Sequence, residues 1–183
     1  LAYPELEPPF LCLAISGGNT LLVEVRDYTD YGTALQNIDR QAEAVAAYEK
    51  AYELNPKNLD LLRSLADTYA AANDFESCVK YYQRVVDSPD SKANDIFELG
   101  VAYYNLALTT DDAAKKAAAT ENSRRYITEV DQKVPDNVRI VNQLAKVEKL
   151  SEGGEANGKA APVYRRLITL LNSKDNPSDY DSY

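Results

Sequence analysis

The strongest constraint on the fold of this chain is an internal repeat with a period of 34 residues. Large apolar, small and aromatic residues each recur at that interval. The recurring sets are Tyr31, Leu65 and Leu99; Gly32, Ala66 and Gly100; Leu35, Tyr69 and Tyr103; Ala44 and Cys78; Tyr48 and Tyr82; and Ala51 and Val85. A repeat of this length is one supersecondary unit that cannot bury its apolar face alone, so neighbouring units stack. The sequence therefore predicts a fold of stacked repeats.

Each repeat carries the pattern of two amphipathic helices. In AEAVAAYEKAYEL the apolar face falls at helical spacing, with the charged residues on the other side. Its members are Ala44, Ala47, Tyr48, Ala51 and Leu54. Asn55-Pro56 ends this helix, because the residue before a proline is pushed out of the α region. We expect a second helix over 60–72, and we expect the small residues of the repeat to let paired helices approach closely.

This pattern resembles the tetratricopeptide repeat, and YGTALQNIDRQAEAVAAYEKAYELNP at 31–56 is the clearest match. The family combines a 34-residue period with a large-small pair, later aromatic and alanine positions, and a proline at the end of the unit. The resemblance implies an all-α, right-handed helical-repeat solenoid of three to four helix pairs over residues 27–175. It also implies a role in protein-protein interaction.

The third repeat is longer than the others. Counted from Ala93, the proline that ends the repeat is expected near position 124. It is found at Pro135 instead, so this repeat is 11 residues longer than the others. Eleven residues make about three helical turns, so the insertion lengthens a helix without rotating its apolar face. We therefore expect DDAAKKAAATENSRRYITEV to form one extended helix, with its KK and RR pairs on a solvated face.

A fourth helix pair follows the long repeat. Its first helix is expected over 138–150, and SEGGEANG then forms a mobile loop with three glycines. The second helix begins near Lys159. The two expected buried faces are Val141, Leu144, Ala145 and Val147 in the first helix, and Ala160, Val163, Tyr164, Leu167, Ile168 and Leu171 in the second. Residues 176–183 are expected to be a flexible polar tail.

Composition narrows the classes of function. A formal net charge of -9 over 183 residues repels phosphate backbones, so we expect no nucleic acid and no membrane as partner. With no histidine and two cysteines, Cys12 and Cys78, the chain offers neither a zinc site nor a Ser-His nucleophile. We therefore predict no metal, no cofactor and no enzymatic activity. The cytoplasm is slightly favoured, although a chain that begins at Leu1 leaves room for an upstream segment.

The N-terminal region, residues 1–26, has a different pattern. LAISGGNTLLVEV, residues 13–25, indicates two short apolar strands joined at Gly17 and Gly18. Glycines supply the positive φ that tight hairpin turns need, and they can also point backbone N–H groups at a phosphate. We favour the structural role, and predict a short β-hairpin ahead of the helical repeats.

The stretch YPELEPPFLCLAISGGNTLLVEVRDY at 3–28 resembles the family of tRNA N6-adenosine threonylcarbamoyltransferases, in which a Ser-Gly-Gly-His-Thr motif follows a strand. Ser16, Gly17, Gly18 and Thr20 match that motif, while Asn19 replaces the histidine. The resemblance implies a remnant of a nucleotide site in a two-lobed, actin-like fold. The family's metal-binding histidines and the rest of both lobes have no counterpart here, so these positions are expected to be non-functional. A natural fusion, a joining error and a deliberate chimera all produce such a chain.

The tetratricopeptide resemblance also implies a binding groove. In that family, positions 2, 5, 9, 12 and 13 of each unit face the groove. Counted from Leu59 and Ala93, these positions supply Arg63, Asp67, Asn94, Phe97, Val101, Tyr104 and Asn105. Phe97 and Tyr104 share one helical face and are expected to hold apolar side chains of a peptide, while Arg63 holds an acidic group. The structural alternative is that Phe97 and Val101 only pack against the next helix pair.

These patterns leave three hypotheses for function. The first is a non-catalytic adaptor that binds a partner's peptide or helix in the groove. The second is an inactive remnant of the tRNA-modifying enzyme, and the third is an architectural spacer. Binding of ATP favours the remnant, capture of a protein partner favours the adaptor, and neither result favours the spacer.

Overall fold

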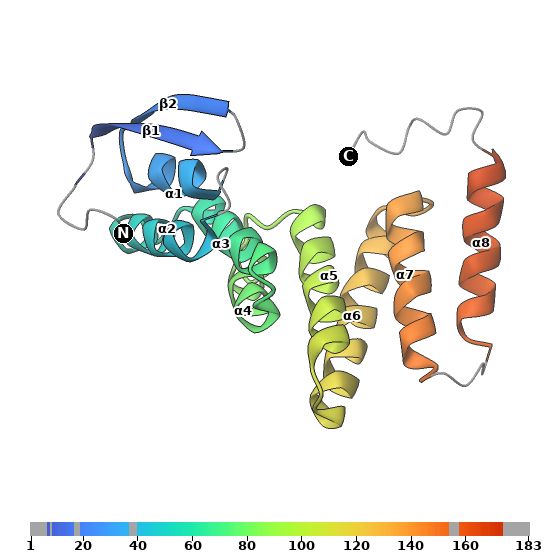
Figure 1. Ribbon diagram of the computed structural model, residues 1–183. Coiled ribbons are helices and arrows are strands. Elements are labelled where there is room, and N and C mark those ends of the chain that lie inside the picture. The colour runs from blue at the N-terminus through green and yellow to red at the C-terminus, as the bar shows by residue number, and fades with distance from the viewer. Residues whose placement is uncertain (1–6, 8, 17–18, 37–39, 154–157, 174–183) are drawn as a thin grey trace. The chain divides into compact units, whose positions relative to one another are not determined.

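The computed structural model of the chain describes residues 7, 9–16, 19–36, 40–153 and 158–173. These residues form two strands and eight helices, which fall into two compact units, Leu1–Val85 and Val86–Tyr183. Figure 1 shows the elements in chain order. The helical content agrees with the all-α repeat fold predicted from the 34-residue period. The predicted domain boundaries at 26 and 175 stay predictions.

The first unit begins with two antiparallel strands, β1 (Phe10–Ser16) and β2 (Asn19–Val25). Phe10 pairs with Val25 at one end of the ladder, and Ser16 pairs with Asn19 at the other. Gly17 and Gly18, on which the predicted hairpin turn depends, lie outside the described residues, so the hairpin itself stays a prediction. Val25 is completely buried, which anchors the end of β2 in the unit.

Four helices complete the first unit, and they follow the predicted repeat. They are α1 (Tyr28–Gln36), α2 (Gln41–Leu54), α3 (Leu59–Ala71) and α4 (Phe75–Val86). The apolar faces predicted for these helices are buried at Ala44, Tyr48 and Ala51, among others. Leu54 is an exception and is 69% exposed. It is the last residue of α2, where the chain leaves the helix pair, and no helix in the described part of the chain covers it.

The close approach predicted at the small residues is present. A Cβ atom added to Gly32 would lie 2.9 Å from the ring of Tyr48, which is 2% exposed. The Tyr48 hydroxyl also lies 2.9 Å from the hydroxyl of Thr33. Because the ring lies directly against the backbone of α1, glycine is the residue that this position accepts. The repeat of small residues therefore reflects helix packing.

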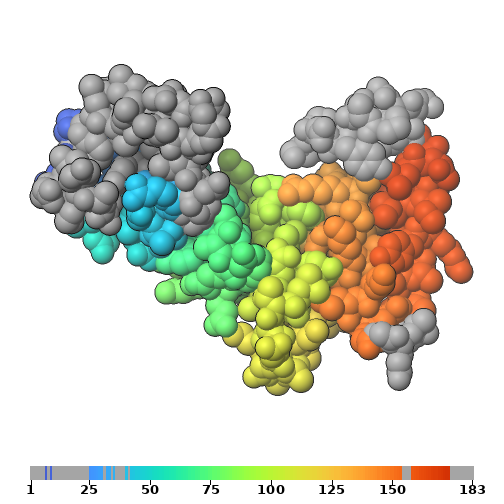
Figure 2. Space-filling model, viewed as in Figure 1, coloured from blue at the N-terminus to red at the C-terminus, as the bar shows by residue number. Residues whose placement is uncertain are grey.

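The second unit contains the two remaining helix pairs. Its helices are α5 (Ala93–Thr109), α6 (Ala113–Lys133), α7 (Val138–Ser151) and α8 (Ala160–Ser173). α5 packs on α6, α6 on α7, and α7 on α8. Figure 2 shows the four helices as a continuous succession, from yellow-green at α5 to orange-red at α8. The 21-residue α6 confirms one extended helix, but part of the insertion lies in α5, which has 17 residues where α3 has 13.

α6 is fixed to its neighbours on both sides. Ser123 donates a 2.7 Å hydrogen bond to the carbonyl oxygen of Gly100 in α5. On the other side, Arg124 forms an ion pair of 2.9 Å with Glu148 of α7. The prediction that the RR pair lies on a solvated face is therefore wrong for Arg124, whose side chain is only 26% exposed. Its partner is distant in the sequence, and local periodicity gives no sign of it.

Apolar burial on α8 is narrower than predicted. Ala160 and Leu167 are buried and Val163 is half-buried, but Ile168 and Leu171 are 56% and 37% exposed. In the described part of the chain, α8 contacts α7 along one side and has no later helix to cover the other. Polar contacts add to this docking, because Arg166 binds Asp131 of α6 with two hydrogen bonds of 2.6 and 3.0 Å.

Candidate functional site

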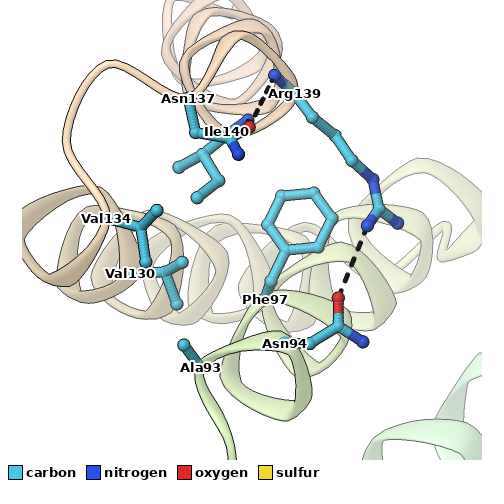
Figure 3. Close-up of a pocket in the computed structure, with 8 residues that line it drawn as sticks. All are labelled: Ala93, Asn94, Phe97, Val130, Val134, Asn137, Arg139 and Ile140. Atoms are coloured by element: carbon cyan, nitrogen blue, oxygen red, sulfur yellow. Dashed lines mark hydrogen bonds between the residues drawn. The ribbon is translucent and has the colours of Figure 1, made fainter. Parts of the chain in front are cut away.

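The second unit contains an apolar hollow at the start of α5 and α7, with a volume of about 170 Å³. We call it the apolar hollow, and Figure 3 shows its lining. The residues that form it are Ala93, Asn94 and Phe97 of α5, Val130 and Val134 at the end of α6, and Asn137, Arg139 and Ile140 at the start of α7. A cavity of about 150 Å³ with an apolar lining can hold a molecule of the size of benzene. The hollow is therefore large enough for one aliphatic side chain.

Arg139 fixes one wall of the apolar hollow. Its guanidinium carbon lies 4.3 Å from the centre of the Phe97 ring, in a cation-π arrangement. One terminal nitrogen donates to Glu98 at 2.7 Å. The other donates to Asn94 at 3.5 Å, as Figure 3 shows. The guanidinium therefore joins the polar rim of the hollow to the Phe97 ring in its apolar floor.

Asn137 positions the opposite rim. Its side-chain oxygen accepts hydrogen bonds from the backbone N–H groups of Arg139 at 3.0 Å and Ile140 at 3.3 Å, which caps the start of α7. Asn58 caps α3 in the same way through Asp60 and Leu61. The two caps lie 79 residues apart, which is two repeats plus the 11-residue insertion. The repeat therefore sets the local geometry of the hollow as well as the helix order.

A second and larger hollow, of about 520 Å³, lies near the end of α7. We call it the lysine hollow. The residues that form it are Tyr104 of α5, Lys116 of α6, Lys146, Lys149 and Leu150 of α7, Gly153, and Tyr164 of α8. All three lysines are exposed. Their ammonium groups make no ion pair or hydrogen bond with any residue that the structure describes.

Tyr104 is half-buried at the edge of the lysine hollow. Desolvation raises the pKa of its hydroxyl above the ordinary value, and the nearby Tyr164 hydroxyl raises it further. The Tyr104 hydroxyl therefore stays protonated at neutral pH and can donate a hydrogen bond. Together with three ammonium groups, the hollow offers donors and positive charge to a ligand.

The seven predicted groove residues are divided between the two units. Asn94 and Phe97 line the apolar hollow, and Tyr104 lines the lysine hollow. Val101 and Asn105 are half-buried on α5 and line neither hollow. Arg63 and Asp67 lie on α3 of the first unit.

On α3, each charged groove residue already has a partner in its own unit. Arg63 donates to Asp60 at 2.6 Å, and Asp67 accepts a hydrogen bond of 2.5 Å from the hydroxyl of Tyr82. Desolvation raises the pKa of the Asp67 carboxyl, whereas the bond from Tyr82 lowers it. The groove assignment as a whole stays a prediction.

The sequence prediction missed the contribution of α7. The predicted unit beginning at Ala93 spans 34 residues plus the 11-residue insertion, so the next unit begins at Val138. Counted from there, positions 2, 9 and 12 are Arg139, Lys146 and Lys149, which line the two hollows. The signal was therefore present in the repeat. Lys116 has no such signal, because it belongs to the second helix of its pair.

The candidate nucleotide positions lie in and between the two strands. Ser16, Asn19 and Thr20 lie at the ends of the strands, where only the backbone pairing is described. Gly17 and Gly18 lie outside the described residues. Within the described ranges, no helix combines the length and apolar character needed to cross a membrane.

Comparison with known proteins identifies the repeat. A family model described as tetratricopeptide repeat matches residues 40–92. The solved structure of a thermophilic TPR protein from Thermus thermophilus superposes with a TM-score of 0.60 at 18% identity, covering 82% of this chain and 75% of that one. At this level of identity the similarity shows the fold alone.

The second resemblance is also found among known sequences. The tRNA N6-adenosine threonylcarbamoyltransferase of a Cyanothece species is 48% identical over 54 residues, which are 30% of this chain and 15% of that enzyme. The enzyme of Clostridium novyi is 45% identical over 187 aligned residues, with 98% of this chain and 50% of that enzyme covered. The chain thus spans at most half the length of these two relatives. It contains a tetratricopeptide repeat region and has partial similarity to the tRNA N6-adenosine threonylcarbamoyltransferases.

Proposed function

We propose that the chain is a non-catalytic interaction scaffold, and that the second unit binds an extended segment of a protein partner along α5 and α7. The repeat region supports a scaffold role, because stacked helix pairs present extended surfaces to partners. The proposal that a peptide binds at α5 and α7 rests on the two hollows. No cofactor and no metal enter this proposal.

The main support for the proposal is the open space in the apolar hollow. Phe97, Val130 and Ile140 are buried to at least 94%, yet about 170 Å³ of space remains open between them. Peptide segments that bind repeat or helical surfaces insert apolar side chains as anchors into such spaces. The polar rim of Asn94, Asn137 and Arg139 offers hydrogen-bonding groups to a peptide backbone.

Selection from a peptide library tests this function. The full chain is exposed to random peptides of about 12 residues, which span roughly 40 Å when extended. We expect enrichment of peptides that carry a Leu, Ile, Val or Phe anchor. Failure to enrich any peptide above the level of the unselected library would contradict the proposal.

A filled-hollow variant then locates the binding. Ala93→Phe places a ring in the apolar hollow, and we expect it to weaken binding of the enriched peptides at least tenfold, the loss of about one anchor side chain. Ala118→Phe is the matched control, because Ala118 is exposed on α6 and lines neither hollow. Circular dichroism checks that both variants keep wild-type helicity. Equal affinity of the two variants would show that the peptides bind elsewhere.

The partial similarity to the threonylcarbamoyltransferases favours a second candidate, a remnant that still binds a nucleotide. Isothermal titration of the full chain with ATP tests it. A saturable isotherm with a Kd below about 1 mM, lost on changing Gly17 and Gly18 to Ala, would favour the remnant. We expect no such binding and no ATP hydrolysis.

A further inference from the structure

We propose that the lysine hollow binds an acidic segment of the partner polypeptide, beside the apolar anchor that occupies the apolar hollow. This inference rests on the proposed function, because both hollows take residues from α5 and α7. It adds the chemical class of the partner, namely a peptide that combines an apolar residue with nearby Asp or Glu side chains.

The first observation behind this inference is the distribution of charged side chains in the second unit. Lys116, Lys146 and Lys149 line one hollow, and none of them meets a carboxylate within the described ranges. Three arginines of this unit, by contrast, are paired. Arg124 binds Glu148, Arg139 binds Glu98, and Arg166 binds Asp131, each within 3.0 Å.

Within the described residues, three ammonium groups around one hollow lack a carboxylate partner, although the chain has a net charge of -9. Acidic residues outnumber basic ones, 29 to 20, so local partners are plentiful for the cations. Because like charges in one hollow repel, an anionic ligand lowers the electrostatic energy of the site. Complementary charge of this kind also steers a partner toward the surface and selects against the wrong ones.

The two tyrosines of the lysine hollow suit a carboxylate. The Tyr104 hydroxyl stays protonated at neutral pH, so it can donate a hydrogen bond to a carboxylate oxygen. The aromatic rings of Tyr104 and Tyr164 offer an apolar surface to the methylene groups of a Glu side chain. The hollow therefore matches the side chain of an acidic residue in both its polar and its apolar parts.

The spacing of the two hollows predicts the spacing of the ligand. Phe97 in the apolar hollow and Tyr104 in the lysine hollow are seven residues apart on α5. Seven helical residues rise about 10 Å, which an extended peptide covers with roughly three residues. We therefore expect the acidic residue three or four positions from the apolar anchor.

A peptide fits these observations better than a nucleic acid. The net charge of -9 opposes a long phosphate backbone, whereas a few carboxylates can use the local positive charge. In addition, the adjacent apolar hollow accepts an aliphatic side chain, which a nucleic acid lacks. Binding of a single-stranded oligonucleotide is therefore the alternative outcome that the experiment must include.

The peptide selection described above also tests this inference. Among the enriched peptides we expect an excess of Asp and Glu over the unselected library, concentrated three or four positions from the apolar anchor. An enriched set with apolar anchors but no acidic excess would overturn the inference while leaving the proposed function intact. Failure to enrich any peptide would instead contradict the proposed function.

Charge reversal gives the second readout, by fluorescence anisotropy with one enriched peptide. We expect the double variant Lys146→Glu, Lys149→Glu to bind about tenfold more weakly, because each exposed pair contributes a small favourable energy and the reversal adds repulsion. Lys57→Glu is the control, since Lys57 is an exposed cation on the first unit with no partner among the described residues. Raising the salt concentration should weaken wild-type binding, whereas it should strengthen binding of the double variant, because salt also screens the added repulsion.

Two outcomes would overturn the inference at this stage. One is wild-type affinity of the double variant for the acidic peptide. The other is tighter binding of a single-stranded oligonucleotide than of any enriched peptide, with the oligonucleotide lost in the same double variant. Circular dichroism of each variant separates loss of binding from loss of fold.

Discussion

At the scale of single residues, the repeat is maintained by a few close contacts between helices. Gly100 is the tightest of these, because a Cβ atom added there would lie 2.6 Å from the Cδ1 atom of Ile127. Ile127 is completely buried, so its side chain has little freedom to move aside. The small residue at this repeat position is thus a requirement of the α5–α6 interface.

We expect Gly100→Ala to destabilise the protein by about 1–2 kcal/mol. Overpacking of a core costs about 1–3 kcal/mol, and the higher helix propensity of alanine returns at most about 1 kcal/mol. In an Ile127→Ala background the clash is absent, so the same change should be neutral or stabilising. Urea unfolding of the four proteins measures the coupling, and an equal loss in both backgrounds would contradict the packing explanation.

The capping of α7 by Asn137 gives a second prediction for a single residue. Asn137→Ala removes the cap of α7 and should lower the free energy of unfolding by about 1 kcal/mol, whereas Asn137→Asp keeps a capping oxygen and should be nearly neutral. Thermal unfolding compares the two variants. If both lose the same stability, the side chain acts by something other than capping.

The sequence predicted the roles of some of these residues and missed those of others. Gly100 and Tyr48 were found because they recur at the repeat interval, which local packing imposes on every unit. Arg124 and Arg139 were not found, because their partners Glu148 and Glu98 lie in other helices and no local period relates them. Ion pairs across a helix-helix interface depend on tertiary geometry that periodicity alone does not contain.

At the scale of elements, the boundaries of the helices follow from the repeat and from its insertion. The insertion lengthens both helices of its pair, since α5 is four residues longer than α3 and α6 is nine residues longer than α4. The caps at Asn58 and Asn137 mark equivalent helix starts. α8 departs most from expectation, because a periodic apolar stripe shows that a helix has an apolar side but not how much of that side a neighbour covers. Ile168 and Leu171 are therefore exposed where the stripe predicted burial.

Polar contacts of Arg166 support the docking of α8, beside the apolar cluster that Leu167 forms with Val138 and Val141. We expect Arg166→Gln to remove its bonds to Asp131 and Asp136, to lower stability by about 1 kcal/mol, and to increase proteolytic cleavage around α8. Arg165→Gln is the matched control, because Arg165 is exposed and its side chain has no partner in the described ranges. Identical cleavage rates for the two variants would contradict this account.

At the scale of the whole molecule, the chain has two resemblances, one to the tetratricopeptide repeat and one to the tRNA N6-adenosine threonylcarbamoyltransferases. The family model begins at residue 40, so α1 and the strands lie outside it. Both hollows belong to the second unit, and so does the local positive charge. The sequence alone predicted an interaction scaffold and five residues of α5, but it did not extend the count through the insertion to α7, where Arg139, Lys146 and Lys149 lie.

Removing the N-terminal region tests this division of the chain. We expect a variant without residues 1–26 to keep most of its helicity and to bind the selected peptides within about twofold of the wild-type affinity, a difference well below 1 kcal/mol. The physical reason is that the strands contribute no residue to either hollow. Circular dichroism and anisotropy measure the two quantities, and loss of cooperative unfolding would show that the strands belong to the core of the repeats.

The central claim is that α5 and α7 together form the surface that binds a partner. Amide chemical-shift mapping of the isotope-labelled full chain, titrated with an enriched peptide, tests it most directly. We predict that the largest shift changes fall at 93–105 and 138–150, with smaller changes at Lys116 and Tyr164. Largest changes confined to the first unit, or to the exposed residues of α6 and α8 away from the two hollows, would contradict the claim.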